Sequence, residues 1–229
     1  MVSTLLWDVD GTLLNFEKSE DYSLRKCLAD IGVTADAAMV ARYSEINTRY
    51  WKALERGEIS RERVREGRFE EFFDREGIDC RDIPAFNIAY QTRLGEVYFP
   101  NDGAPELVSA LRGRVRQYAV TNGSALAQHA KLRLSGLGAL LDGIFISEEL
   151  GVEKPDPEFF RKVFAALPEA VPEHTVIVGD SLTSDMLGGM RAGIRCWWYN
   201  PEGKACPPEI TVQHQLRDLN EIPALLDQE

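Results

Sequence analysis

A chain of 229 residues has room for one large domain, or for a core domain with a smaller insert. Hydrophobic residues make up 44% of the chain, which is enough for a buried core, and the formal net charge is −11. This charge argues against a general nucleic-acid-binding protein, because no positive surface is available to neutralise many phosphates. Any phosphate group must therefore be bound locally.

The cysteines and the first residues predict where the protein works. Four cysteines show no C-x-x-C spacing and are too sparse for a disulfide framework, which favours reduced thiols. Residues 1–7 contain no basic segment, and no long apolar run follows them. We expect a cytoplasmic protein without a signal peptide or a membrane span.

The first predicted element is a buried strand that begins near Leu5 and ends at two carboxylates, Asp8 and Asp10. Ligands bind at the carboxyl ends of the strands in an open α/β sheet, so this pair is a candidate site. Side chains alternate along a strand, so both carboxylates could point the same way, with a divalent cation between them. Taken alone, the pair fits equally well an ordinary strand exit with Asx turns.

Residues 15–99, which we call the helical block, are predicted to be an insert of amphipathic helices. Glycines at positions 32, 57 and 77 fall where these helices would end. The aromatic side chains of the block favour a bundle core over a binding surface. Three apolar stripes carry the prediction: Leu24, Cys27, Leu28 and Ile31; Met39, Tyr43, Ile46, Tyr50 and Leu54; Phe69, Phe72 and Phe73.

After a turn-rich segment at residues 100–105, predicted strands alternate with predicted helices. The strands are 117–120, 144–146, 176–178 and 196–199, and the helices are 126–134, 159–167, 186–192 and 219–226. Repeated βα units indicate a parallel sheet covered on both faces. The sequence thus predicts an α/β fold, with a Rossmann-like core formed by residues 1–14 and 100–229 and a helical insert at 15–99.

Four of the predicted strands are followed by chemically active side chains. Alone, Thr121-Asn122-Gly123 is a common turn signal and Lys154 an ordinary surface lysine. In chain order the four motifs are Asp8-Val9-Asp10-Gly11-Thr12, Thr121-Asn122-Gly123, Lys154-Pro155 and Gly179-Asp180-Ser181-x-x-x-Asp185. In this order they resemble the haloacid dehalogenase superfamily of phosphohydrolases over nearly the whole chain. Four motifs together favour an enzyme over a structural protein.

The resemblance implies a catalytic role for each of five residues. Asp8 would be the nucleophile that forms an aspartyl-phosphate, and Asp10 the general acid and base. Thr121 and the backbone after it, at Asn122, would donate hydrogen bonds to the phosphate, and Lys154 would supply positive charge. Superfamily members that remove halide or pump ions lack an acid/base aspartate at position 10, so Asp10 favours turnover of a phosphate ester.

The same resemblance implies a Mg²⁺ ion. Asp8, the backbone carbonyl of Asp10 and Asp180 would bind it directly, because hard divalent cations take oxygen ligands. Asp185 would lie behind these ligands or contact the ion through water.

Members of this superfamily carry an inserted cap that closes over the site and provides the specificity contacts. The resemblance implies that residues 15–99 are such a cap. Four segments of the chain resemble the bacterial pyrimidine 5′-nucleotidases in particular: Trp51 to Ile59, Gly67 to Glu70, Ile146 to Val152 and Leu187 to Gly193. This resemblance implies that the partner is a nucleoside monophosphate. Candidate base contacts are Tyr43, Tyr50, Trp51, Arg68 and Phe69.

Other functions remain open on the sequence alone. The same scaffold serves phosphatases of other small esters, such as phosphoglycolate or sugar phosphates, and phosphosugar mutases. An inactive phosphate-binding regulatory module is an alternative of another class. The intact pair Asp8 and Asp10 argues against it, because a binding protein needs no acid/base aspartate. The sequence does not separate the nucleotidase from the mutase, and the oligomeric state is not readable from it.

Overall fold

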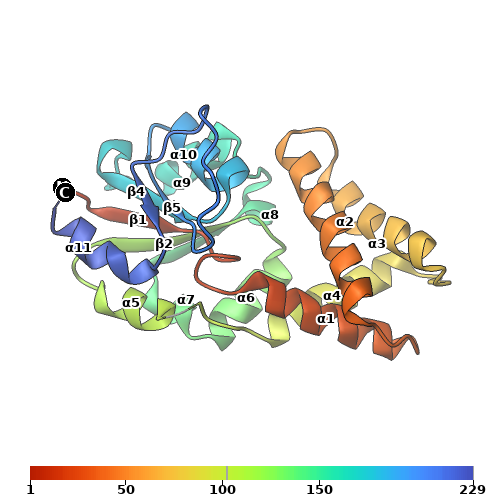
Figure 1. Ribbon diagram of the computed structural model, residues 1–229. Coiled ribbons are helices and arrows are strands. Elements are labelled where there is room, and N and C mark those ends of the chain that lie inside the picture. The colour runs from red at the N-terminus through yellow and green to blue at the C-terminus, as the bar shows by residue number, and fades with distance from the viewer. Residues whose placement is uncertain (102, 229) are drawn as a thin grey trace.

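A parallel sheet forms the centre of the computed structural model, which describes residues 1–101 and 103–228 (Figure 1). Its six strands lie in the order β3-β2-β1-β4-β5-β6. They are β1 (Thr4–Trp7), β2 (Arg116–Thr121), β3 (Gly143–Ile146), β4 (Thr175–Gly179), β5 (Arg195–Tyr199) and β6 (His214–Leu216). All neighbours are parallel. The five predicted strands and the predicted α/β class are confirmed, and β6 is an addition.

Helices cover both faces of this sheet, as the alternation of side chains along β1 requires. Leu5 and Trp7 contribute to the apolar core on one face and Leu6 to the core on the other. The first face is covered by α5 (Ala104–Ala110), α6 (Ala125–Leu134), α7 (Leu137–Leu140) and α11 (Ile222–Leu226), and the second by α8 (Ser147–Leu150), α9 (Pro157–Ala166) and α10 (Leu187–Arg191). Short helical turns lie at Pro172–His174, Leu182–Met186 and Leu219–Glu221.

The helical block has an apolar core of its own. Its helices are α1 (Phe16–Asp30), α2 (Ala37–Glu55), α3 (Arg61–Glu76) and α4 (Ile83–Glu96). Each helix is preceded by a capping residue whose side chain accepts a hydrogen bond from the backbone N–H three positions on. These caps are Asn15, Asp36, Ser60 and Asp82. Most residues of the predicted stripes are buried in this core. Met39 and Tyr50 are half-buried against it, Leu54 is buried outside it, and Ile31, which caps α1, is 44% exposed.

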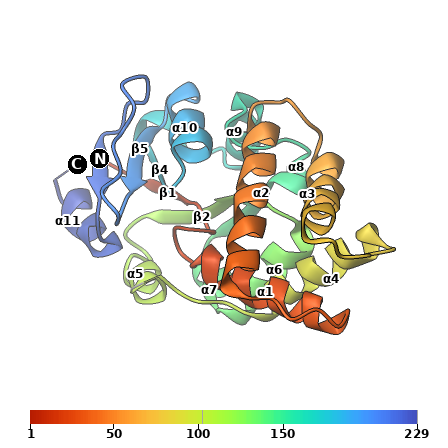
Figure 2. The same cartoon turned by 45° about the vertical axis from the view of Figure 1, so that its right-hand side comes forward.

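The helical block stands beside the carboxyl ends of the strands, and Figures 1 and 2 show it from two sides. Arg61, the first residue of α3, donates hydrogen bonds to the Gly123 carbonyl after β2 and to Ser147 after β3. Helix α4 packs along α6, where Gly95 and Ala130 face each other. The block therefore covers the edge of the sheet at which the sequence motifs were predicted.

The order of the strands also places a crevice at this edge. From β1, the chain runs outward in one direction to β2 and β3, and in the other direction to β4, β5 and β6. Such a reversal separates the connections above the carboxyl ends of the two central strands, which is where ligands bind in open α/β sheets. In the described part of the chain, none of the helices has both the length and the apolar character needed to cross a membrane.

Candidate active site

Lys154 is the centre of the charged cluster at this edge. Its side chain is buried, and its Nζ donates to Asp8 Oδ1 at 2.8 Å, Asp185 Oδ1 at 2.6 Å and the Val120 carbonyl at 2.6 Å. Burial alone would lower the pKa of Lys154, but the charges of Asp185 and Asp8 outweigh it and raise the pKa above its usual range. The ammonium is therefore charged and held at three points.

Three carboxylates surround this ammonium and repel one another. Asp8 follows β1, Asp180 follows the neighbouring β4, and Asp185 lies in the helical turn after it. Burial, and next the charge of Asp185, raise the pKa of Asp8 well above its ordinary value and that of Asp180 to about 7. One oxygen atom from each carboxylate can be chosen so that all three lie within 4.8 Å of one another. The site thus concentrates negative charge on two buried carboxylates, Asp8 and Asp185, and on the more exposed Asp180.

The two polar side chains of the motif after β2, Thr121 and Asn122, have different surroundings. Thr121 Oγ1 is buried and has no hydrogen-bond partner among the described residues, so its hydroxyl still requires one. Asn122 instead binds the backbone of Lys154, because its Nδ2 donates to the Lys154 carbonyl at 2.8 Å and its Oδ1 accepts the Lys154 N–H at 2.9 Å. The Asn122 side chain therefore holds the segment that carries Lys154.

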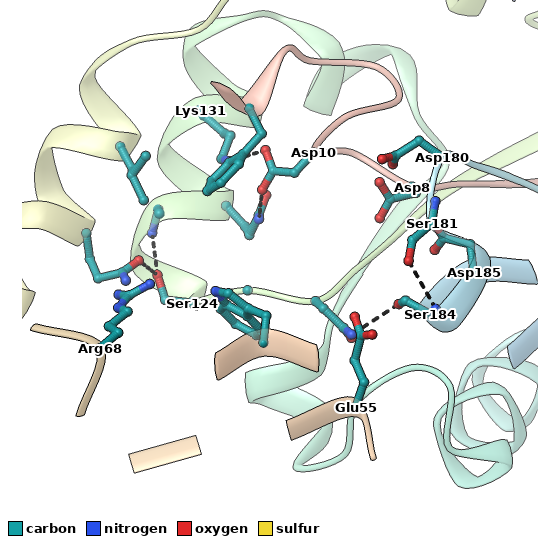
Figure 3. A pocket seen from close by; sticks show the side chains of 18 residues that line it. Asp8, Asp10, Glu55, Arg68, Ser124, Lys131, Asp180, Ser181, Ser184 and Asp185 are labelled. Atoms are coloured by element: carbon teal, nitrogen blue, oxygen red, sulfur yellow. Dashed lines mark hydrogen bonds and ion pairs between the residues drawn. The ribbon is translucent and has the colours of Figure 1, made fainter. Parts of the chain in front are cut away.

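Asp10 lies at the same strand exit, but its carboxylate has different partners. Lys131 Nζ donates to its Oδ1 at 2.5 Å, and Gln128 Nε2 donates to its Oδ2 at 2.7 Å. Figure 3 shows Asp10 turned toward Lys131, whereas Asp8 lies beside Asp180 and Asp185. Asp8 and Asp10 thus line the same pocket, but their carboxylates bind different partners, because α6 supplies the donors to Asp10.

A pocket extends from these carboxylates to the helical block (Figure 3). Of the five residues predicted as candidate base contacts, Trp51 and Arg68 line this pocket. Tyr43 and Phe69 do not, because their rings stack in the core of the block at 5.3 Å. Tyr50 is also absent from the pocket lining. The other lining residues include Phe16, Glu55, Gln91, Leu94, Ser124 and Ser184.

A family model for haloacid dehalogenase-like hydrolases matches residues 2–193, which include every motif at this strand edge. The chain belongs to the haloacid dehalogenase-like hydrolases. The expected family and the expected enzyme class are thereby confirmed.

Among relatives of this haloacid dehalogenase-like hydrolase, the HAD-hydrolase YfnB of Bacillus subtilis is 38% identical over 98% of this chain and 95% of its own. A crystal structure of YfnB bound to magnesium covers 99% of both chains with a TM-score of 0.94. The pyrimidine 5′-nucleotidase PynA of Streptococcus pneumoniae is 37% identical over 86% of this chain and 83% of its own. The pyrimidine 5′-nucleotidase YjjG of Escherichia coli is 29% identical over 97% of this chain and 96% of its own.

The carboxylates of this hydrolase suit a hard divalent cation. All the side-chain donors are oxygens, and their mutual repulsion is relieved when a cation lies between them. Asp185 is already engaged, because its Oδ1 accepts from Lys154 and its Oδ2 from the Ser181 N–H at 3.1 Å. Asp8 and Asp180 are thus better placed to bind the ion directly, with Asp185 behind them.

Sequence reasoning missed several residues of this site. Gln128 and Lys131 escaped because they lie on a helix and not at a strand end. Thr12 was counted only as part of its motif, although its Oγ1 donates to Asp180 Oδ1 at 3.2 Å. A usable signal was present: Gln128 and Lys131 are one helical turn apart, on the face of α6 that also carries the buried Leu132 and Ala127.

Proposed function

We propose that this hydrolase is a Mg²⁺-dependent phosphomonoesterase that acts through an aspartyl-phosphate at Asp8 and prefers pyrimidine nucleoside monophosphates. The observation that carries this proposal is that Asp8 lines the pocket, accepts a hydrogen bond from the Lys154 ammonium and lies within reach of a cation shared with Asp180. The reaction class agrees with the nucleotidase relatives PynA and YjjG.

The first chemical step is attack of the Asp8 carboxylate on phosphorus. Lys154 holds Asp8 in place, and its charge favours the transferring phosphoryl group. The unpaired Thr121 hydroxyl donates a hydrogen bond to a phosphoryl oxygen. When bound, Mg²⁺ supplies positive charge that offsets the repulsion between nucleophile and phosphate.

Asp10 moves the protons of both half-reactions. In its protonated form, Asp10 donates that proton to the leaving ester oxygen as Asp8 is phosphorylated, and the alcohol departs, which leaves Asp10 as a carboxylate. It then removes a proton from the water that attacks phosphorus, which releases inorganic phosphate and restores the Asp8 carboxylate. The Asp10 side chain is 19% exposed, so it retains access to the pocket.

In this proposal, residues 1–14 and 100–229 form the catalytic core and residues 15–99 form a cap over it. Three contacts of Arg61 support this division, because its guanidinium joins α3 to the Gly123 carbonyl, to Ser147 and, at 2.5 Å, to Glu153. The pocket lies between the two parts, so closing the cap excludes water from it.

The chemistry of the pocket supports a pyrimidine substrate. Arg68 is buried, and its guanidinium donates to Asn47 Oδ1 at 2.8 Å and Asn87 Oδ1 at 3.0 Å. Its Nε has no hydrogen-bond partner among the described residues. A carbonyl acceptor satisfies this donor, and uracil and thymine carry two carbonyls whereas adenine carries none. Trp51 and Leu94 supply the apolar walls that a base requires.

Specificity constants for matched phosphate esters test this proposal. We expect kcat/KM for uridine and thymidine monophosphates to exceed that for adenosine monophosphate and glucose 6-phosphate by about tenfold to a hundredfold, as a difference of ~1 to 3 kcal/mol in base contacts gives. The variant Asp8→Asn is the control that assigns any phosphate release to this site. Equal values for the purine nucleotide, or a preference for the hexose phosphate, would refute the pyrimidine specificity.

A further inference from the structure

Both oxygens of the Asp10 carboxylate are held by donors from one face of helix α6. Lys131 Nζ binds Oδ1 at 2.5 Å and Gln128 Nε2 binds Oδ2 at 2.7 Å. A carboxylate held at one oxygen can still rotate about that contact, whereas one held at both has a fixed position and a fixed plane. The two donors are three residues apart, so a single helical turn presents them together.

The two donors are themselves buried. Lys131 is 1% exposed and Gln128 is 2% exposed, which is rare for such long polar side chains. Asp10 is the carboxylate with which the buried Lys131 forms its ion pair. A buried ammonium must be paired, and a paired, immobile ammonium defines where its partner can lie. The arrangement therefore fixes Asp10 more tightly than a surface ion pair would.

Gly123 provides an independent sign that the position of Gln128 matters. A Cβ atom at Gly123 would lie 2.5 Å from Gln128 Nε2, which is closer than nonbonded atoms come. Its φ is not in the left-handed region, so the turn itself does not demand a glycine here. A side chain at this position of the Thr121-Asn122-Gly123 motif would therefore force the Gln128 amide to shift from its place beside Asp10.

We propose that Gln128 and Lys131 are positioning residues for Asp10: they fix its carboxylate at the angle from which it protonates the leaving oxygen. This inference rests on the phosphatase mechanism proposed above and on the acid role of Asp10. The residues touch Asp10 and act through it. Loss of either donor frees the carboxylate to rotate, which slows proton transfer and leaves attack by Asp8 unchanged.

Dependence on the leaving group distinguishes this role from a structural one. Departure of a ribose 5′-oxygen needs a proton, whereas p-nitrophenolate leaves as a stable anion without one. For Lys131→Met and Gln128→Leu, we expect kcat/KM for a nucleoside monophosphate to fall by about tenfold to a hundredfold, part of the range of general acid catalysis. With p-nitrophenyl phosphate it should change by less than about threefold.

Three further variants complete the experiment. Asp10→Asn should lose kcat/KM for the nucleoside monophosphate but not for p-nitrophenyl phosphate, and its loss is the largest that the positioning variants can show. Lys131→Arg keeps a charged donor and should recover part of the loss. Lys162→Met is the matched control, because Lys162 is a helical lysine that donates to the Leu150 carbonyl away from the pocket. We expect Lys162→Met to match the wild type with both substrates.

The outcomes separate this inference from the proposed function. Equal losses with both substrates in the active variants, or no loss with either, would overturn the positioning role while the phosphatase activity stands. If Lys131→Met does not fold, Gln128→Leu decides alone, since it introduces no charge and nearly preserves volume. A wild-type protein that hydrolyses neither substrate would overturn the proposed function, and this inference with it.

Discussion

Lys154 shows how a few motif residues define the chemistry of this site. Its ammonium contacts Asp8, Asp185 and the Val120 carbonyl in a buried position. The sequence motif indicates that a lysine is needed after β3, and the structure adds that this lysine binds the predicted nucleophile directly. Its removal leaves two buried carboxylates without their shared counter-charge.

We therefore expect Lys154→Met to lose both activity and stability. A broken buried ion pair costs about 3 to 5 kcal/mol, because the remaining charge is uncompensated. Urea denaturation of the metal-free protein measures the change in the free energy of unfolding. The double variant Lys154→Met with Asp185→Asn is the control, and it should recover part of the loss because one of the two charges is then neutral. A single variant as stable as the wild type would contradict the role given to Lys154.

At the residue scale, the sequence was sufficient wherever a side chain belongs to a motif at a strand end. Asp8, Lys154 and Asp180 meet in one cluster, as the convergence of parallel strands predicts. It was insufficient for Asp10, whose orientation depends on Lys131. That contact joins residues 121 positions apart and requires knowledge of how α6 packs. Periodicity reports which face of a helix is buried, but not what lies against it.

At the scale of elements, α6 connects the acid/base residue to the helical block. One face carries Gln128 and Lys131, and Ala127 joins the apolar core of the block. Helix α4 approaches α6 closely, because a Cβ atom on Gly95 would lie 2.6 Å from Ala130 Cβ. The packing of the helical block against the rest of the molecule and the position of Asp10 therefore depend on the same helix.

Gly95→Ala should disturb this contact. Overpacking costs about 1 to 3 kcal/mol, whereas replacing a helical glycine by alanine gains only about 1 kcal/mol. We expect a lower melting temperature and a lower kcat/KM, since α4 must move away from α6.

The compensating variant Gly95→Ala with Ala130→Gly tests whether the effect arises from this contact. It removes the opposing methyl group and exchanges the two helix propensities, so it should return both quantities close to the wild-type values. If the double variant were as impaired as Gly95→Ala, the close approach of α4 and α6 would not be the cause.

The elements differ in how well the sequence predicts them. Strands β1, β2 and β4 are buried apolar runs bounded by turns, which is a strong signal. Strand β6 escaped because it has three residues, of which Leu216 alone is buried. Helix α4 was included in the helical block without a stripe of its own, although a signal was present, because the buried Phe86, Tyr90 and Leu94 recur every four residues.

At the scale of the whole molecule, an excess of negative charge surrounds a site that must accept a phosphate. The local solution is to gather Asp8, Asp180 and Asp185 around one lysine, which leaves the cluster with more negative than positive charge. A bound divalent cation would complete the balance. Removal of Mg²⁺ with EDTA should therefore abolish activity, and added Mg²⁺ should restore it. Full activity in a sample shown to be metal-free by elemental analysis would exclude this role for the ion.

The Mg²⁺ requirement should also depend on pH. Burial and the charge of Asp185 raise the pKa of Asp180 to about 7, so the metal-free protein holds a proton there at pH 6 and loses it by pH 8. Mg²⁺ must displace this proton, so apparent affinity falls as the pH falls, by up to about tenfold per pH unit below the pKa. Half-saturating Mg²⁺ concentrations for activity, checked by the Mg²⁺-induced rise in melting temperature, measure this. Identical values at pH 6 and pH 8 would show that no proton competes with the ion.

The central claim is that Asp8 carries the phosphoryl group. Borohydride reduces an aspartyl-phosphate to homoserine, which peptide mass spectrometry locates. The variant Asp10→Asn, mixed with p-nitrophenyl phosphate and Mg²⁺ and then quenched with borohydride, should contain homoserine at position 8, because it forms the phosphoenzyme but hydrolyses it slowly. Samples without substrate, and the Asp8→Asn variant, should contain none. Release of p-nitrophenol without label at position 8, or with label at another residue, would contradict the account.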